Sequence, residues 1–135
     1  MTREFAVFSI NEAVFAFDVS DVREILRAAS LSPAPGHEGV EGLLNLRGEV
    51  VPVIDVRSRL GLPAREIAVS DYLIVLESEG RRAIVRTESN VRLETMGDSA
   101  VQPATATNSL VTATIRLEKG VASLLTAADL SSGQG

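Results

Sequence analysis

Short runs of apolar and branched residues follow one another along most of the chain, with turn residues between them. This pattern is typical of a small β sandwich or barrel. Eight runs have the length and composition of strands, and consecutive runs form pairs. The expected strands are 5–10 and 14–19, 40–46 and 50–56, 72–77 and 82–87, and 112–117 and 121–125. The sequence therefore predicts a mainly β protein that is built from hairpins.

Two segments between these runs carry signals for short helices. Ser20 is of a type that caps helices, and the apolar residues Val22, Ile25 and Leu26 recur after it at helical spacing. We expect a helix of about two turns there, with these three side chains on one face. Residues 57–60 precede a glycine and a proline, which predicts a single helical turn and a stop.

Two residues restrict the geometry of the hairpin expected from the third and fourth runs. Gly48 lies between the runs and can supply the positive φ of a tight turn. Pro52 has no amide hydrogen to donate, so we expect its strand at a sheet edge, or with that position turned outward. Eight strands are more than one compact barrel of this length needs, which favours two barrels. No linker-like composition divides the chain, which favours one folding unit. We therefore expect two small barrels packed as one folding unit.

Charge and composition narrow the classes of function. The 135 residues include 13 Lys and Arg against 18 Asp and Glu, a net charge of −5. This charge repels phosphate backbones and anionic lipids, so nucleic acid and membrane surfaces are not expected partners. The absence of Cys excludes thiol catalysis and thiolate metal sites. The single histidine, His37, has no second histidine one turn away, so we expect no metal or cofactor. It lies among Pro35, Gly36 and Gly39, so we expect an exposed loop residue.

The two ends of the chain carry further signals. Met1 leads into alternating residues without the apolar segment of a secretion signal, and no apolar run approaches ~18 residues. We therefore expect a soluble, cytoplasmic protein. Residues 131–135 have nothing to bury, so we expect a disordered tail after one folded domain over 1–130.

Residues 42–57 read GLLNLRGEVVPVIDVR, and this run closely resembles the signature of the CheW family of bacterial chemotaxis adaptors. Residues 22–25, which read VREI, match an earlier block of the same family in register. The resemblance is strong over 5–62, fair over 72–85 and weak beyond. It implies two small five-stranded barrels with SH3-like curvature and short helices, packed around a shared apolar core.

The resemblance also implies a function. Members of this family are non-enzymatic adaptors that dock the cytoplasmic tips of methyl-accepting chemoreceptors beside the regulatory domain of a CheA-type histidine kinase, within receptor clusters. Three hypotheses stay open for this chain. It is a full coupler, an accessory that binds receptors but has lost kinase binding, or a small hydrolase or transferase, which would need a cluster of Asp and Glu in a pocket.

The matched motifs carry the candidate receptor contacts. Glu24 and Arg47 lie in the two matched blocks, and a helix beside a tight turn could bring them together at the rim of a groove. The alternative is that both are solvated charges worth at most ~1 kcal/mol. Val22 could line the receptor groove or belong to the core. Asn45 and Asp55 are expected to hold the local turns.

Three further residues are candidate kinase contacts. Gly42 could allow close approach of the kinase, or it could mark a β-bulge. Arg86 stands where the family carries Asp, and Glu88 stands at a usually apolar position, in a half of the chain expected to lie apart from Arg47. These charges would weaken the kinase contact, or they could pair with each other on a solvated face. The segment 103–112 is also shorter than is usual in the family.

Overall fold

The computed structural model describes residues 1–28, 39–68, 70–88, 90–104, 110–127 and 130, which form eleven strands in two sheets. The strands are β1 Thr2–Ile10, β2 Ala13–Asp18, β3 Val22–Arg27, β4 Val40–Leu46, β5 Glu49–Ile54, β6 Tyr72–Ser78, β7 Arg81–Thr87, β8 Arg92–Gly97, β9 Val101–Pro103, β10 Val111–Leu117 and β11 Gly120–Leu125. The helical elements are α1 Val56–Arg59 and the 3-10 turns η1 Val19–Asp21 and η2 Asp98–Ala100.

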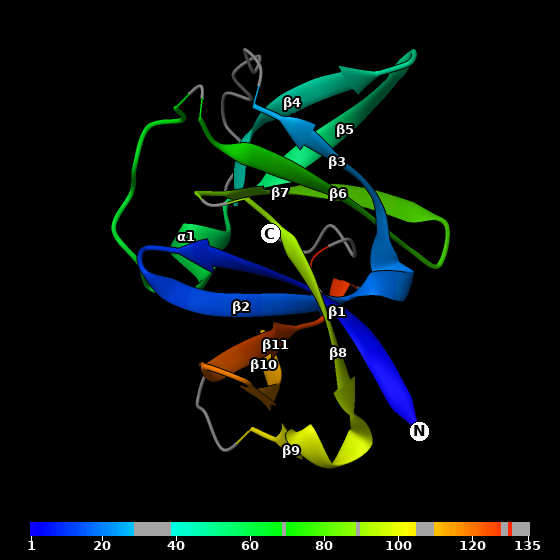
Figure 1. Ribbon diagram of the computed structural model, residues 1–135. Helices are drawn as coiled ribbons and strands as arrows, with labels where there is room; N and C mark the ends of the chain where they lie inside the picture. The colour runs from blue at the N-terminus through cyan, green and yellow to red at the C-terminus, as the bar shows by residue number, and fades with distance from the viewer. Residues whose placement is uncertain (29–38, 69, 89, 105–109, 128–129, 131–135) are drawn as a thin grey trace.

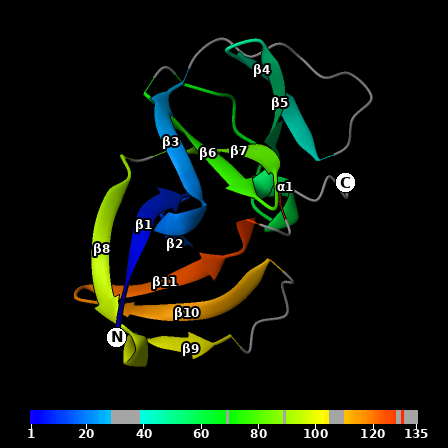
Figure 2. The ribbon, with the colours of Figure 1, turned by 90° about the vertical axis from the view of Figure 1, so that its right-hand side faces the viewer.

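Each sheet curls into a small barrel, and the two barrels are stacked (Figure 1 and Figure 2). One sheet has the strand order β8-β1-β2-β11-β10-β9 and so joins the two ends of the chain. We call it the terminal barrel. The other has the order β3-β6-β7-β5-β4 and uses the middle of the chain. We call it the central barrel. The architecture is that of two packed SH3-like barrels, as expected, although the terminal sheet has six strands rather than five.

An apolar core lies between the barrels because several strands are buried on both faces. Side chains alternate along a strand, so Phe5 and Val7 of β1 fill the terminal barrel while Phe8 and Ile10 point toward the central one. Strand β6 alternates in the same way, with Ile74 and Leu76 in the shared core and Leu73 and Val75 inside the central barrel. The shared core consists of Phe8, Ile10, Phe15, Phe17, Ile54, Val56, Ile74, Leu76, Ala83, Val85, Leu110, Leu125, Ala127 and Leu130. The ring centroids of Phe8 and Phe17 are 5.4 Å apart.

The four hairpins expected from the sequence are confirmed, and so is the helical turn at α1. The helix expected after Ser20 is wrong, because residues Val22–Arg27 form β3 and pair with β6. Their burial alternates along the strand, and the register shifts between Val22 and Glu24. The capping side chain is Asp18, which accepts from the Ser20 amide. Strands β8 and β9 were not expected from the sequence.

Pro52 does not lie on an edge strand. Strand β5 is an inner strand between β7 and β4, so the edge position expected from this proline is wrong. The pairs of β5 with β7 are Val53 with Ile84 and Ile54 with Val85, immediately after the proline. Pro52 itself pairs with Leu43 of β4, so the missing amide falls where the pairing with β7 has not begun.

Two expectations concern residues outside the described part of the chain, namely the loop position of His37 and the disorder of 131–135. Within the described part, the helices are too short and too polar to cross a membrane.

Phe8→Ala tests whether the shared core couples the two barrels. The Phe8 side chain is fully buried between them, so its loss should lower the free energy of unfolding by about 3–5 kcal/mol. Urea unfolding followed by far-ultraviolet circular dichroism should show one transition for the wild type and for the variant. Leu93→Ala, at a side chain that is 59% exposed, should change the free energy by less than about 0.5 kcal/mol. Two separate wild-type transitions would contradict this coupling.

Candidate functional site

The turn between β4 and β5 places the side chain of Arg47 at one end of the central barrel. Arg47 and Gly48 both have positive φ, 52° and 91°, as in the two-residue turns whose twist matches that of a hairpin. The Asn45 side-chain oxygen accepts a hydrogen bond from the Gly48 amide at 2.9 Å and fixes this turn. Asn45 therefore has the local role that the sequence predicted for it, as does Asp55, which accepts from the Ser58 amide at the start of α1.

Arg47 and Glu24 form a two-pronged ion pair. Nη1 of Arg47 donates to Glu24 Oε1 at 3.2 Å, and Nη2 lies 3.1 Å from Oε2. Strands β3 and β4 are the two edges of the central sheet, so the pair joins the ends of this sheet. The contact expected from the sequence is confirmed, but Glu24 lies on a strand and not on a helix. The Arg47 side chain stays 75% exposed, against 27% for Glu24.

Further charges continue from this pair across the same end of the barrel. Glu77 of β6 contacts Arg23 at 3.2 Å and Arg82 at 3.1 Å, and Arg82 reaches Glu49 at 2.7 Å. We call the whole set the mouth cluster: Arg23, Glu24, Arg47, Glu49, Glu77 and Arg82. The hydrogen bond with Glu77 and the charge of Glu49 raise the pKa of Arg82 above its ordinary value.

The sequence analysis missed Arg82, although a signal was present. In the expected hairpin of 72–77 and 82–87, Glu77 and Arg82 stand directly opposite each other, and the structure pairs them in that register. Opposite charges at facing positions of a hairpin stabilise it and indicate a shared face. Their link to Arg23 and Glu49 depends on the strand order, in which β3 lies beside β6 and β5 beside β7, and could not be read from the hairpin alone.

Val22 and Gly42 lie on β3 and β4 and differ in burial. Val22 is partly buried and packs against the shared core. Gly42 is buried where the register of β4 shifts between Val40 and Gly42, so the β-bulge, one of the two alternatives, is present. A role of Val22 in receptor binding and of Gly42 in kinase binding stays a prediction.

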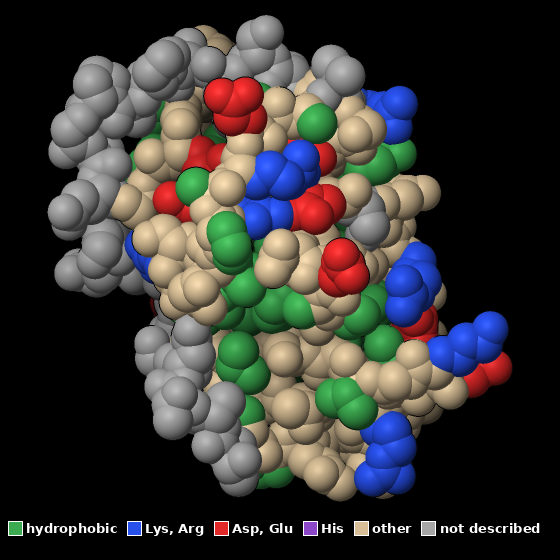
Figure 3. All heavy atoms as spheres, turned by 90° about the vertical axis from the view of Figure 1, so that its left-hand side faces the viewer, with side chains coloured by type: hydrophobic (Ala, Val, Ile, Leu, Met, Phe, Trp, Pro, Cys, Tyr) green, Lys and Arg blue, Asp and Glu red, His purple; other side chains and the backbone are tan. Residues whose placement is uncertain are grey.

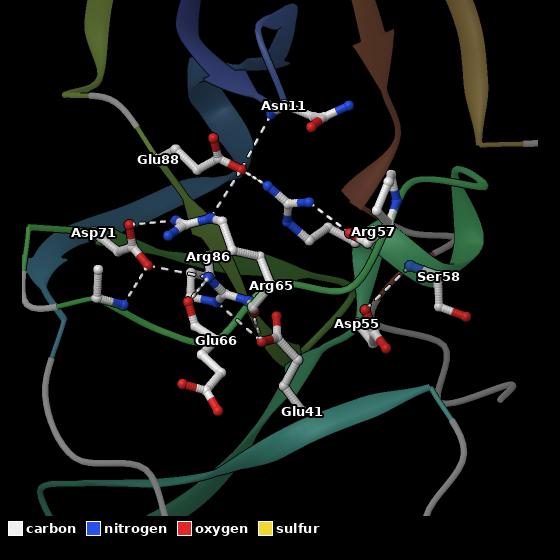
Figure 4. A network of polar contacts seen from close by, with 12 residues as sticks. Asn11, Glu41, Asp55, Arg57, Ser58, Arg65, Glu66, Asp71, Arg86 and Glu88 are labelled. Atoms are coloured by element: carbon white, nitrogen blue, oxygen red, sulfur yellow. Dashed lines mark hydrogen bonds and ion pairs between the residues drawn. The ribbon is translucent and has the colours of Figure 1, made fainter.

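A second group of charges lies at the opposite end of the central barrel, near α1 (Figure 4). We call it the internal cluster: Glu41, Arg57, Arg65, Asp71, Arg86 and Glu88. The Arg86 side chain is only 3% exposed and donates to Glu41 at 2.7 Å, to Asp71 at 3.0 Å and to the Arg65 carbonyl at 2.7 Å. Figure 3 shows charged side chains gathered on this face of the central barrel, above a band of hydrophobic ones.

Glu88 connects this cluster to the terminal barrel. Its carboxylate pairs with Arg57 and with Arg65, and it accepts a hydrogen bond from the Asn11 amide in the β1–β2 turn at 3.1 Å. The Glu88 amide donates to the Ser9 carbonyl at 3.1 Å. Glu88 therefore ties the strand β7 of one barrel to the first hairpin of the other.

Three expectations about Arg86 and Glu88 need correction. The two side chains do not pair with each other on a solvated face, because each has its partners inside the internal cluster. They do not lie in a different barrel from Arg47 either, since β7 belongs to the same sheet as the β4–β5 hairpin, although they lie at the opposite end of that barrel. A side chain as buried as Arg86 also presents little charge to a partner, so Arg86 gives no reason to expect a weakened kinase contact, and the strength of that contact stays a prediction.

The internal cluster shifts the ionisation of its members. Burial raises the pKa of Asp71, but hydrogen bonds from the Ala68 amide, Arg65 and Arg86 outweigh it and hold the pKa below its ordinary value. Burial also lowers the pKa of Arg86, and Glu41 and Asp71 outweigh this effect, so its pKa is raised. In Arg57, burial and the nearby charge of Arg65 lower the pKa. The described residues contain no group of three or more acidic or histidine side chains placed to hold a metal ion.

Comparison with known proteins identifies the class. Residues 4–134 match the family model described as a CheW-like domain. The crystal structure of the scaffolding protein TtCheW from Thermoanaerobacter tengcongensis superposes with a TM-score of 0.84, at 24% identity, over 93% of this chain and 89% of that one. Fold and family model therefore define a CheW-like domain of two SH3-like barrels. The chain belongs to the CheW family.

Two curated relatives are both named chemotaxis protein CheW. The protein of Rhizobium meliloti (strain 1021) is 31% identical over 102 residues, which cover 75% of this chain and 66% of that protein. The protein of Bacillus subtilis (strain 168) is 39% identical over 71 residues, which cover 52% of this chain and 46% of that protein. The matched parts thus span between about half and two thirds of the length of these relatives.

Asp71→Asn tests the internal cluster. The change leaves Arg86 and Arg65 with less counter-charge in a buried place, so it should lower the free energy of unfolding by about 3 kcal/mol at neutral pH. The lowered pKa of Asp71 means that its contribution is complete above the unfolded pKa of about 3.9 and is lost as the pH falls through the folded pKa.

The difference in urea stability between wild type and Asp71→Asn should therefore be largest above about pH 5 and should narrow as the solution is acidified. The matched control is Asp98→Asn, an exposed carboxylate, which should stay within about 0.5 kcal/mol of the wild type. A stability difference that grows on acidification would contradict the role given to Asp71.

Proposed function

We propose that this protein is a non-enzymatic, cytoplasmic adaptor of chemotaxis-like signalling, recruited to receptor clusters, where it couples receptor tips to a CheA-type histidine kinase. Its membership of the CheW family and the names of its relatives support this proposal. Membership supports a scaffold or adaptor role in chemotaxis. The two specific partners are the further step that we propose.

The observation that carries the proposal is the Glu24–Arg47 pair. A guanidinium group has five N–H donors, and Glu24 engages only part of them. The side chain of Arg47 is mostly exposed, yet Glu24 and the fixed turn restrict its direction. A cation that is both exposed and oriented is suited to recognise a partner, because little conformational entropy is lost on binding. We place the receptor contact on Arg47, Glu24 and the neighbouring Val22.

Arg47→Glu should abolish binding to a purified receptor signalling tip while the protein stays folded. The substitution reverses a charge in an exposed turn, opens no cavity and sets two carboxylates side by side. Binding is measured by calorimetric titration, with circular dichroism to check the fold. Arg116→Glu, the same charge change on an exposed position of the terminal barrel, is the control and should bind normally. A folded Arg47→Glu protein that binds the receptor tip normally would contradict the placement of the receptor contact on Arg47.

The double variant Glu24→Arg with Arg47→Glu separates two roles for the pair. The swapped charges can still attract each other, so a pair that only holds the two sheet edges together would be restored. If Arg47 itself contacts the receptor, the double variant should bind as poorly as Arg47→Glu alone.

The accessory alternative rested on the charges of Arg86 and Glu88, as disturbances of a kinase surface, and on the short segment 103–112. Both side chains have their partners within the internal cluster, and Arg86 is buried. Of its grounds only the short segment 103–112 is left, much of which lies outside the described residues, and we retain kinase binding in the proposal. We do not assign the kinase contact to Arg86.

Titration of the kinase regulatory domain into this protein should give a dissociation constant in the micromolar range or tighter, about −8 kcal/mol or more favourable. The receptor tip is titrated in parallel as the reference for a folded, active sample. Receptor binding without measurable kinase binding would contradict the coupler and restore the accessory alternative.

A further inference from the structure

A small hollow lies within the mouth cluster, beside the Glu24–Arg47 pair. Its volume is about 30 Å³, enough to admit one small polar group or a water molecule. Its walls combine charged side chains with apolar ones from the core of the central barrel. They are Arg23, Glu24, Leu46, Arg47, Val75 and Arg82.

The charges that line the hollow are unbalanced. The residues that line the hollow include three arginines and one carboxylate, that of Glu24, whereas Glu49 and Glu77, which pair with Arg82 and Arg23, do not line it. Leu46 and Val75 supply a partly apolar wall, which strengthens interactions between charges because it excludes water. A recess of this size and charge suits a single carboxylate, the group with which guanidinium makes its best-matched hydrogen bonds.

Arg82 is paired with Glu49, the most exposed carboxylate of the mouth cluster. Its Nη1 donates to Glu49 Oε1 at 2.7 Å, while its Nε donates to Glu77 Oε1 at 3.1 Å. The Glu49 side chain is 55% exposed and adjoins the β4–β5 turn. An exposed ion pair of this kind contributes little to stability, so a carboxylate from a partner can replace Glu49 without loss of the fold.

We propose that the hollow receives a carboxylate side chain of the receptor tip, and that Arg82 selects this side chain by exchanging Glu49 for it. This inference rests on the proposed function, because it extends the Glu24–Arg47 contact across β7. Glu77 keeps the guanidinium of Arg82 in place, and Arg23 and Arg47 complete the positive wall. Arg82 is thus a specificity-determining residue of the receptor site, and Glu49 is its internal competitor.

Two substitutions with opposite expected effects test this proposal. In calorimetric titrations with a purified receptor signalling tip, Arg82→Gln should weaken binding at least about tenfold, because the incoming carboxylate loses its partner. Glu49→Gln should tighten binding about two- to threefold, because the competing carboxylate is removed while its shape is kept. A residue that only held the strands together would weaken binding in both variants.

Matched controls complete the experiment. Arg116→Gln removes an equivalent charge on the terminal barrel and should bind as the wild type does. Arg82→Lys keeps the charge and should retain more affinity than Arg82→Gln, which also covers the case that the glutamine variant unfolds. Affinity for the kinase regulatory domain should be the same in wild type and variants.

Unchanged receptor binding by Arg82→Gln, or weaker binding by Glu49→Gln, would overturn the inference while the proposed function stands. An equal loss of receptor and kinase binding in Arg82→Gln would overturn it as well, because it would indicate general damage. A wild-type protein that does not bind the receptor tip would instead contradict the proposed function itself.

Discussion

The shared apolar core between the barrels is the constraint on which the other features depend. Strands β1, β2, β6 and β7 are buried on both faces, so their polar residues fall mainly toward the strand ends. Strand β7 shows the result. Arg82, Ile84 and Arg86 have the same parity and so share the inner face of the central barrel, with Ile84 in its core and one arginine toward each end. The mouth cluster and the internal cluster are therefore the two polar ends of one apolar barrel.

Burial separates the roles of these two ends. In the internal cluster, Arg86 and Asp71 are almost completely buried. Removing one partner would leave an unpaired charge away from water, which typically costs about 3–5 kcal/mol of stability. In the mouth cluster, the side chains are between about a quarter and three quarters exposed, and water screens their pairs. The weak ion pairs of the mouth cluster can be exchanged for contacts with a partner, whereas the buried ion pairs of the internal cluster stabilise the packing of the two barrels.

The sequence predicted the hairpins and the proximity of Glu24 and Arg47, because alternation and turn residues are local signals and the family motif covers both positions. It did not predict β3 as a strand, since Val22, Ile25 and Leu26 also fit a helical spacing. The ion-pair partners of Arg86 could not be predicted from the sequence for a different reason. Glu41 lies 45 positions away along the chain, and the strand order, with β5 between β4 and β7, brings the two together. The pair of Glu77 and Arg82, by contrast, follows from the hairpin register alone.

The connectivity of the terminal barrel sets the order in which the molecule can assemble during synthesis. Strand β2 pairs in parallel with β11, which joins Phe15 near the start of the chain to Ser123 near its end. The central barrel needs only residues 22–87, so its strands are available early, while β1 and β2 wait for the last hairpin to leave the ribosome. Contacts between distant parts of a chain also slow folding. The face of the first hairpin that carries Phe5, Val7 and Ala16 packs against the last hairpin, so it stays uncovered until that hairpin is made and is exposed to aggregation in the meantime.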